Sequence, residues 1–255
     1  DATLRALTLG AVDFVPKPNG SSSLAFIGAK EEFLEKLRAC VSANLKAVHR
    51  KPVLARAPKS GGSDRVVCIA SSTGGPKALA TLWQSLPEGF PAAILIAQHM
   101  PSGFTQSLAK RLTAVGSVPC REAQNGDYVR PGAAYIAPGG YHMVVTSGGL
   151  IELNQEAPVH GVRPAADHLF QSAAAVYGSK LLGIVLTGMG RDGAAGAKAV
   201  RDAGGLVYGE DESTCAIYGM PRAAKELGGI NAEFPIHELG AAVVAGLKDR
   251  VARAS

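Results

Sequence analysis

The sequence has little of what metal-bound, exported or membrane-spanning proteins need. Aromatic residues make up only 5% of the chain, and its four cysteines include no Cys-x-x-Cys pair. The cysteines therefore lack zinc-site spacing, and we expect buried, inert thiols in a reducing compartment. No apolar run reaches the about 20 residues that a membrane-spanning helix requires, and the first residues do not form a charged-then-apolar leader. The sequence thus predicts a soluble cytoplasmic protein that does not insert into a membrane.

The net charge of +5 is concentrated in one short stretch. Residues 45–65 carry six basic side chains, one acidic side chain and no aromatic side chain. A surface that follows nucleic-acid phosphates should also offer aromatic rings on which bases can stack. We therefore interpret this stretch as a solvated basic linker, and nucleic acid is not an expected partner.

The first 64 residues are predicted to form a partial α/β unit and a linker. Residues 3–10 have a helical pattern and residues 12–15 a strand pattern, while residues 31–45 carry an apolar stripe typical of a helix. Residues 49–64 are basic, contain proline and end in a Ser-Gly-Gly-Ser run, which is linker composition. We therefore expect a first unit at residues 1–48, a linker at 49–64 and a main domain at 65–255.

The main domain is predicted to be an α/β fold. Apolar, β-rich runs alternate with helical patterns, which indicates a doubly wound, mostly parallel sheet with helices on both faces. Three strand and helix pairs are expected at residues 66–70 and 76–86, 93–97 and 104–114, and 181–186 and 194–203. Further runs at 134–137, 142–146 and 150–153 include a hairpin around Ser147-Gly148-Gly149. We expect the hairpin as an antiparallel annex on the sheet, and a helix at 237–252 to close the domain.

Polar side chains suited to catalysis follow three of the predicted strands. Ser72 follows the first strand, His99 the second and Asp192 a later one. Loops at the carboxyl ends of parallel strands converge on one edge of the sheet. A serine hydroxyl needs a base within hydrogen-bond reach, and that base needs an acceptor that fixes its tautomer. The order predicts Ser72 as nucleophile, His99 as base and Asp192 as the supporting carboxylate, with Thr73 and the turn at 188–190 as candidates for the oxyanion site.

Each of these residues also has a simpler structural interpretation. Ser72 could cap the helix that begins near Pro76, and Asp192 could cap the helix that begins near Ala194. His99 could be a packed polar residue. The other histidines lie in a strand or in polar segments, and we expect no metal cluster among them: His49, His142, His160, His168 and His237. Convergence of all three candidates on one edge favours chemistry over capping.

Several motifs of the main domain resemble the CheB methylesterase family, in register from about Val66 to Gly229. These motifs are Ser71-Ser72-Thr73-Gly74-Gly75, Gln98-His99-Met100-Pro101-Ser102-Gly103-Phe104, Tyr135-Ile136-Ala137-Pro138-Gly139, Arg163-Pro164 and Thr187-Gly188-Met189-Gly190-Arg191-Asp192-Gly193-Ala194-Ala195-Gly196. The resemblance implies that the catalytic serine, histidine and aspartate are Ser72, His99 and Asp192, with Met189 beside the oxyanion. The family commonly has alanine where this chain has Ser71, so a second hydroxyl adjoins the nucleophile.

The resemblance also implies a substrate, partners and a regulatory unit. It implies hydrolysis of glutamate methyl esters on methyl-accepting chemotaxis receptors, with glutamine deamidation at the same site and no metal or organic cofactor. Residues 11–18, with the helix that follows, resemble the C-terminal end of a two-component receiver domain, in which Lys17 would contact the phosphorylated aspartate. The stretch that would supply that aspartate is absent. We therefore expect a truncated regulator that phosphodonors do not switch, whereas a full-length relative would also bind a chemotaxis histidine kinase.

Two other functions remain open at this point. The run Gly188-Met189-Gly190-Arg191-Asp192-Gly193 has the Gly-x-Gly-x-x-Gly form of a dinucleotide fingerprint, and Glu210 and Asp211 follow about 20 residues later, as such sites require. Little chain remains beyond this run to build the adenine half of such a site. The chain could also be a non-catalytic module that docks on receptors or kinases.

Overall fold

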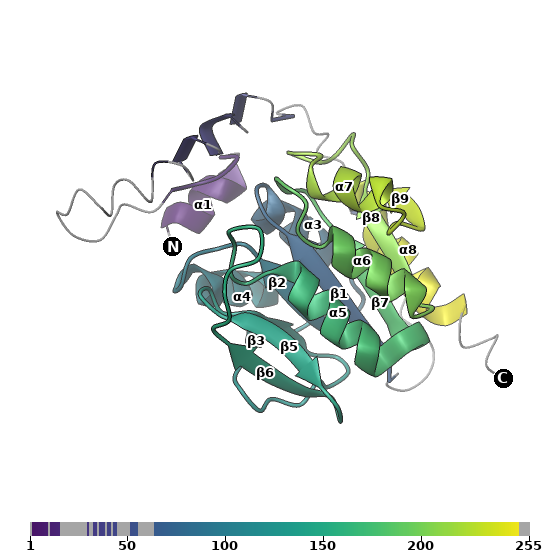
Figure 1. Ribbon diagram of the computed structural model, residues 1–255. Helices are drawn as coiled ribbons and strands as arrows, with labels where there is room; N and C mark the ends of the chain where they lie inside the picture. Colours follow the sequence, from purple (N-terminus) through teal and green to yellow (C-terminus); the bar gives the residue numbers. More distant parts are fainter. Residues whose placement is uncertain are drawn as a thin grey trace.

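A seven-stranded parallel sheet forms the centre of the protein (Figure 1). The computed structural model describes residues 2–9, 11–15, 30, 33–34, 36–38, 40–41, 43–44, 52–55 and 64–249. The strand order is β3-β4-β2-β1-β7-β8-β9, and each pairing between neighbours is parallel. The strands are β1 (Val66–Ser71), β2 (Ala93–Gln98), β3 (Cys120–Glu122), β4 (Ala134–Ile136), β7 (Leu181–Val185), β8 (Leu206–Glu210) and β9 (Ala232–Phe234).

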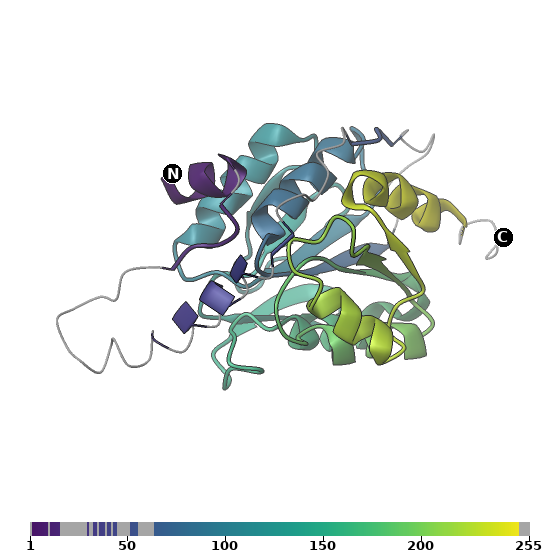
Figure 2. The same ribbon diagram turned by 90° about the horizontal axis from the view of Figure 1, so that it is seen from above.

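Helices cover both faces of this sheet, as the sequence predicts (Figure 2). One face carries α3 (Gly75–Ser85), α4 (Phe104–Val115) and α8 (Ile236–Asp249), and the other carries α5 (Ala166–Tyr177), α6 (Ala194–Asp202) and α7 (Met220–Glu226). A 3-10 turn, η1 (Gly178–Lys180), links α5 to β7. The three predicted strand and helix pairs are confirmed, and each boundary agrees within one residue.

The alternation of side chains along β1 shows why the sheet is buried on both sides. Val67 and Ile69 belong to the hydrophobic core under α3, α4 and α8. Val66, Cys68 and Ala70 belong to a second core under α5, α6 and α7. Successive side chains of a strand point to opposite faces, so a strand between two helix layers is apolar at every position.

The predicted hairpin is present, but it is not part of the main sheet. Strands β5 (His142–Thr146) and β6 (Leu150–Asn154) form a separate two-stranded antiparallel sheet, and β5 packs against α5. The turn between them contains Gly148 and Gly149 with φ values of 87° and 76°, a conformation that glycine adopts without a steric penalty. The predicted antiparallel annex is therefore present, and it is attached through helix α5 and not through an edge of the main sheet.

The described N-terminal residues lie on the main domain. Helix α1 (Ala2–Leu9) packs against α3, and its Leu7 is buried. Residues 11–15 do not form the predicted strand. Instead, Phe14 stacks on Phe104 of α4 with ring centroids 4.6 Å apart, and Asp13 contacts the main domain. The strand prediction is wrong because the apolar side chains of this segment find their contacts on helices, not in a strand ladder.

The predicted stripe on the next helix is only partly described. All residues between 30 and 41 that the structure describes are helical. Three apolar side chains of the predicted stripe are exposed: Phe33 by 47%, Leu37 by 52% and Val41 by 88%. The stripe thus exists but is not buried against described residues; Leu45 and Lys17 lie outside them. In the predicted linker, the backbone N–H groups of Val53 and Ala55 donate to carbonyls of the main domain at 2.8 and 3.0 Å.

The four cysteines test the expectation of buried, inert thiols. Cys68, Cys120 and Cys215 are buried, whereas Cys40 is exposed, so the expectation of buried thiols is wrong for that residue. Burial raises the pKa of Cys120 to about 12 and raises those of Cys68 and Cys215 as well, which keeps these three thiols inert.

Among the described residues, no helix combines the length and apolarity that a membrane span requires.

Candidate active site

Three loops that carry the candidate residues meet at one edge of the sheet. Ser72 follows β1 and His99 follows β2, while Asp192 lies in the loop after β7. Since β1 pairs with both β2 and β7 in parallel, all three loops leave the sheet on the same side. Backbone hydrogen bonds tie them together: the N–H of Ser72 donates to the carbonyl of Thr187 at 3.1 Å, and the N–H of His99 donates to that of Ser71 at 3.0 Å.

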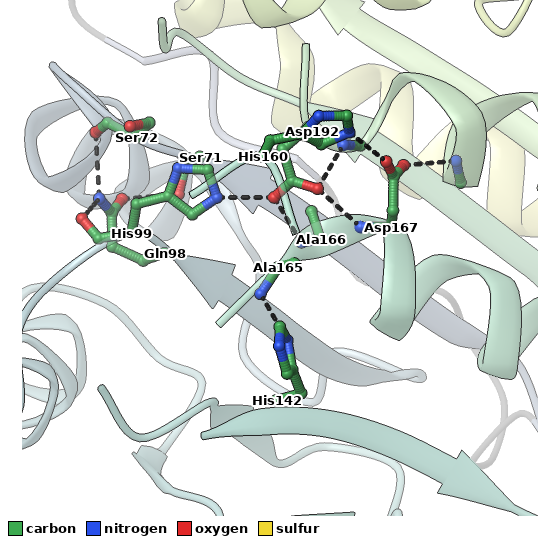
Figure 3. A network of polar contacts seen from close by, with 12 residues as sticks. Ser71, Ser72, Gln98, His99, His142, His160, Ala165, Ala166, Asp167 and Asp192 are labelled. Atoms are coloured by element: carbon green, nitrogen blue, oxygen red, sulfur yellow. Dashed lines mark hydrogen bonds and ion pairs between the residues drawn. The ribbon is translucent and has the colours of Figure 1, made fainter. Parts of the chain in front are cut away.

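The histidine and the aspartate form a close pair. His99 Nε2 lies 2.7 Å from Asp192 Oδ2, and the two side chains are 11% and 2% exposed (Figure 3). Burial alone would raise the pKa of the Asp192 carboxyl, but His99 and the N–H groups of Ala166 and Asp167 outweigh it and lower that pKa. Asp192 therefore remains ionised beside the ring, where it can stabilise an imidazolium.

Four hydrogen bonds hold the Asp192 carboxylate. Besides the His99 ring, Oδ2 accepts the N–H of Ala166 at 2.6 Å, and Oδ1 accepts the N–H groups of Asp167 and Gly193 at 3.0 Å each. Ala166 and Asp167 begin α5, where free N–H groups and the helix dipole favour a negative charge. The capping interpretation is thus wrong about the helix: the N-cap residue of α6 is Gly193, which has no side chain, and Asp192 accepts the first N–H groups of α5 instead.

A second carboxylate makes this arrangement reciprocal. Asp167, in the first turn of α5, accepts the N–H of Gly196 in the first turn of α6 at 2.6 Å. Its other oxygen lies 3.2 Å from Nε2 of His160, a residue with a left-handed φ of 53°. Each of the two helices is therefore capped by an aspartate from the neighbouring segment. This cross-capping fixes α5 and α6 relative to each other and so positions Asp192.

The same residues form a compact cluster that the sequence did not suggest. Ligand atoms of His160, Asp167 and Asp192 all lie within 4.8 Å of one another, which is a possible metal geometry. Both oxygens of Asp192 already accept two hydrogen bonds each, and N–H dipoles that face a site oppose a cation. The cluster contains one histidine, and its hydrogen bonds assign it to the support of Asp192.

Ser72 lies on the other side of the His99 ring, next to the loop after β7 (Figure 3). A Cβ atom built on Gly188 would come within 2.7 Å of Ser72 Cβ, so only glycine allows this approach. The Ser72 hydroxyl makes no hydrogen bond to any residue that the structure describes, and α3 has no side-chain cap. Because His99 uses Nε2 for Asp192, its Nδ1 is the nitrogen that remains for the serine proton.

Two backbone N–H groups beside Ser72 are open to a ligand. Within the described part of the chain, the N–H groups of Thr73 and Met189 have no acceptor. Thr73 directly follows Ser72 and is buried, and Met189 follows Gly188. Buried N–H groups are nearly always paired, so the unpaired N–H of the buried Thr73 is unusual, and together with that of the half-buried Met189 it is suited to a developing oxyanion. The Thr73 hydroxyl is engaged elsewhere, as it donates to Asp13 of the N-terminal segment.

A buried carboxylate supports the loop between β7 and α6. Glu210 is 1% exposed and accepts the N–H of Thr187 at 2.9 Å and the hydroxyl of Thr214 at 3.1 Å. Burial raises the pKa of Glu210 to about 7. The dinucleotide interpretation offers Glu210 or Asp211 to a ribose, but Glu210 is buried and Oδ1 of Asp211 already accepts the N–H and the hydroxyl of Ser213. The Thr187 hydroxyl in turn donates to the carbonyl of Thr73 at 3.0 Å, which joins this loop to the turn that follows Ser72.

The sequence missed α5 and the residues around its start. His142 is buried; its Nδ1 accepts the N–H of Ala165 at 3.1 Å, and its Nε2 lies 3.2 Å from the carbonyl of Ala157. Burial lowers the pKa of His142, which preserves the neutral ring that this acceptor role needs. The buried Leu169, Phe170 and Ala173 show the helical spacing that could have revealed α5. Without that helix, Asp167 looks like an ordinary surface acid.

Comparisons with known proteins identify the family that this chain is similar to. The model of the family described as CheB methylesterase matches residues 67–243. A protein-glutamate methylesterase/protein-glutamine glutaminase of Symbiobacterium thermophilum is 46% identical over 95% of this chain and 72% of its own length. A protein with the same name from Pyrococcus abyssi is 43% identical over 96% of this chain and 69% of its own length. The crystal structure of the CheB methylesterase catalytic domain of Thermotoga maritima is 40% identical, with a TM-score of 0.70 over 72% of this chain and 98% of that one.

Proposed function

Because this chain belongs to the CheB methylesterase family, we infer that it is a hydrolase that acts as protein-glutamate methylesterase and protein-glutamine glutaminase, and we propose Ser72, His99 and Asp192 as its catalytic residues. The observation that carries the residue assignment is the 2.7 Å contact between His99 and Asp192 at the sheet edge where Ser72 lies. The two unpaired N–H groups of Thr73 and Met189 support it.

In the proposed acylation step, Ser72 Oγ attacks the ester carbonyl carbon. His99 Nδ1 takes the serine proton as the bond forms, and Asp192 stabilises the imidazolium through Nε2. The carbonyl oxygen becomes an oxyanion that the N–H groups of Thr73 and Met189 can bind. When the tetrahedral intermediate collapses, the methoxy group leaves with the proton from His99 as methanol. An acyl-enzyme remains on Ser72.

The proposed second step regenerates the enzyme. His99 removes a proton from water, whose oxygen attacks the acyl carbon, and the proton then returns to Ser72 Oγ. The product is a free glutamate side chain. With a glutamine side chain the same sequence releases ammonia in place of methanol, which accounts for both activities in the names of the relatives.

The family acts on chemotaxis receptors, and we propose methylated glutamates of methyl-accepting receptors as the substrates of this chain in chemotactic adaptation. We also propose that residues 1–48 correspond to the C-terminal part of a receiver domain, residues 49–64 to a linker and residues 65–255 to the catalytic domain. A histidine kinase would be a partner of a full-length relative. Asp13 accepts the hydroxyl of Thr73 next to Ser72, and Phe14 packs on Phe104 at the start of α4, which supports a regulatory origin of this segment.

The decisive experiment measures methanol release from methylated receptor. Ser72→Ala should abolish release, because it removes the proposed nucleophile. Ser147→Ala, at the exposed tip of the hairpin, is the matched control and should retain parental activity. Ser71→Ala should stay within about threefold of the parent chain, since the buried Ser71 hydroxyl donates to Gln98 and not to His99. Loss of activity in Ser71→Ala with retention in Ser72→Ala would reassign the nucleophile.

A further inference from the structure

A buried amide side chain connects the loop of the candidate nucleophile to that of the candidate base. Gln98, the last residue of β2, is 1% exposed. Its Nε2 donates to the carbonyl of Ser72 at 3.0 Å and to the carbonyl of His99 at 3.1 Å (Figure 3). One NH₂ group thus uses its two hydrogens on the backbones of the two residues that must exchange a proton.

The orientation of this amide is fixed by its surroundings. Ser71 Oγ, which is fully buried, donates its proton to Gln98 Oε1 at 2.7 Å. A flipped amide would direct Oε1 at two carbonyl oxygens, which cannot donate. Gly75 leaves space for the Gln98 amide, since a Cβ atom at this position would lie only 2.1 Å from Oε1.

The connection lies where the backbone ladder between β1 and β2 stops. The last bond of that ladder runs from the N–H of His99 to the carbonyl of Ser71. Beyond it, the nucleophile turn leads into α3 and the His99 loop leads towards α4, and the described residues show no further backbone hydrogen bond between the two loops. Where the backbone hydrogen bonds between the two loops end, the side-chain amide of Gln98 connects them instead.

We propose that Gln98 is a positioning residue of the reaction, held in its orientation by Ser71, and that it sets the separation of the Ser72 and His99 backbones. This inference rests on the proposed function, because it assumes that Ser72 and His99 exchange a proton. It also gives a role to Ser71, where the family resemblance leads one to expect alanine. A misplacement of about 1 Å between reacting groups can lower a rate about 10²-fold, so the connection acts on turnover and not on substrate affinity.

The test replaces Gln98 by methionine, which has a similar volume but no amide. We expect kcat for methanol release to fall about 10²-fold while KM stays within about twofold, and acylation of Ser72 by a fluorophosphonate to slow by a similar factor. The pH midpoint of the acylation rate should stay unchanged, because the pair of His99 and Asp192 remains intact. Gln84→Met, at an exposed position of α3, is the matched control and should behave as the parent chain does.

Two comparisons keep the outcome decisive. If Ser72→Ala is inactive while folded Gln98→Met shows parental kcat and acylation rate, the positioning role is overturned and the proposed function stands. If Ser72→Ala keeps its activity, the proposed catalytic residues themselves are wrong. Should Gln98→Met not fold, Ser71→Ala decides the matter: it removes only the bond that orients the amide and should slow acylation about twofold to threefold. A parental acylation rate in Ser71→Ala would then overturn the proposal.

Discussion

The two sides of the His99 ring differ in how firmly they are held. On the carboxylate side, Asp192 accepts four hydrogen bonds from His99, from the start of α5 and from its own loop, and it is 2% exposed. On the hydroxyl side, Ser72 Oγ has no hydrogen-bond partner among the described residues. The base is therefore oriented before a substrate arrives, whereas the contact between Ser72 and His99 has still to form.

This difference follows from the electrostatics of each group. A buried carboxylate without partners costs several kcal/mol, so the fold must surround it with donors. A neutral hydroxyl has no such requirement, and its rotation about one bond is inexpensive. Preorganisation is thus concentrated where charge persists throughout the reaction. The nucleophile can adopt its reactive rotamer when the substrate closes the site.

After loss of the nucleophile itself, the largest effect should come from removing the charge on the firmly held side. Asp192→Asn replaces an acceptor-only group by an amide whose NH₂ must face either His99 or the N–H groups of α5. We expect kcat for methanol release to fall about 10⁴-fold, as for the corresponding change in other serine hydrolases. Asp202→Asn, at an exposed site near the end of α6, should leave kcat unchanged. A loss below about tenfold in Asp192→Asn would mean that the carboxylate is only a structural cap.

The next effect is on stability and concerns Glu210, which supports the loop of Asp192 through its hydrogen bond with Thr187. Burial raises its pKa to about 7 in the folded protein from 4.5. Below pH 4.5 both states carry the proton, and stability is greatest. As the pH rises to 7 the unfolded chain releases its proton first, so the free energy of unfolding falls, by about 3 kcal/mol. Glu210→Gln should abolish this fall. Urea unfolding of both proteins at pH 4.5 and 8 measures it, and parallel pH profiles would contradict the assignment.

The sequence predicts one side of the site better than the other. The positions of Ser72, His99 and Asp192 after buried strands follow from strand periodicity and from the rule that loops converge at the carboxyl edge. The residues that support Asp192 do not follow, because they depend on α5, which the sequence analysis does not predict although Leu169, Phe170 and Ala173 have helical spacing. Contacts between the first turns of two helices are set by packing, and no local pattern encodes them.

The same limit applies to the short elements and to the N-terminal segment. Strands β3 and β9 have three residues each, too few to show a period, and their partly buried patterns arise at the edges of the sheet. Residues 11–15 have the β-rich composition of a strand, yet Phe14 packs on Phe104. Intrinsic β preference depends on a neighbouring strand, and packing on a helix overrides it here.

A moderate effect should arise on the loosely held side from its contact with the N-terminal segment. Asp13→Ala removes the hydrogen bond from the Thr73 hydroxyl, which is one of the contacts that hold the N-terminal segment next to Ser72. One hydrogen bond to a charged group contributes about 1.5–3 kcal/mol at most, and this one is partly exposed. We therefore expect kcat/KM for methylated receptor to rise up to about tenfold, with little change for a small ester such as p-nitrophenyl acetate.

The control for this change is Asp127→Ala, which removes an ion pair with Arg121 outside the site. It should leave both substrates unaffected. If Asp13→Ala slows the small ester as much as the receptor, Asp13 holds Thr73 in its active position instead of restricting access. That result would place a second firm support on the hydroxyl side and reduce the contrast between the two sides.

The smallest effect should come from the outermost member of the support for Asp192. His160→Asn removes the ring that contacts Asp167 at 3.2 Å but keeps a residue type that tolerates a φ of 53°. The His160 side chain is 38% exposed, and an exposed pair contributes only about 0.2–1 kcal/mol. Thermal unfolding should therefore change by about one or two degrees, and kcat by less than twofold. Asp192 keeps all four of its own hydrogen bonds in this variant, so a tenfold fall in kcat would show that Asp167 transmits the loss to it and that the carboxylate side is held less firmly than its contacts suggest.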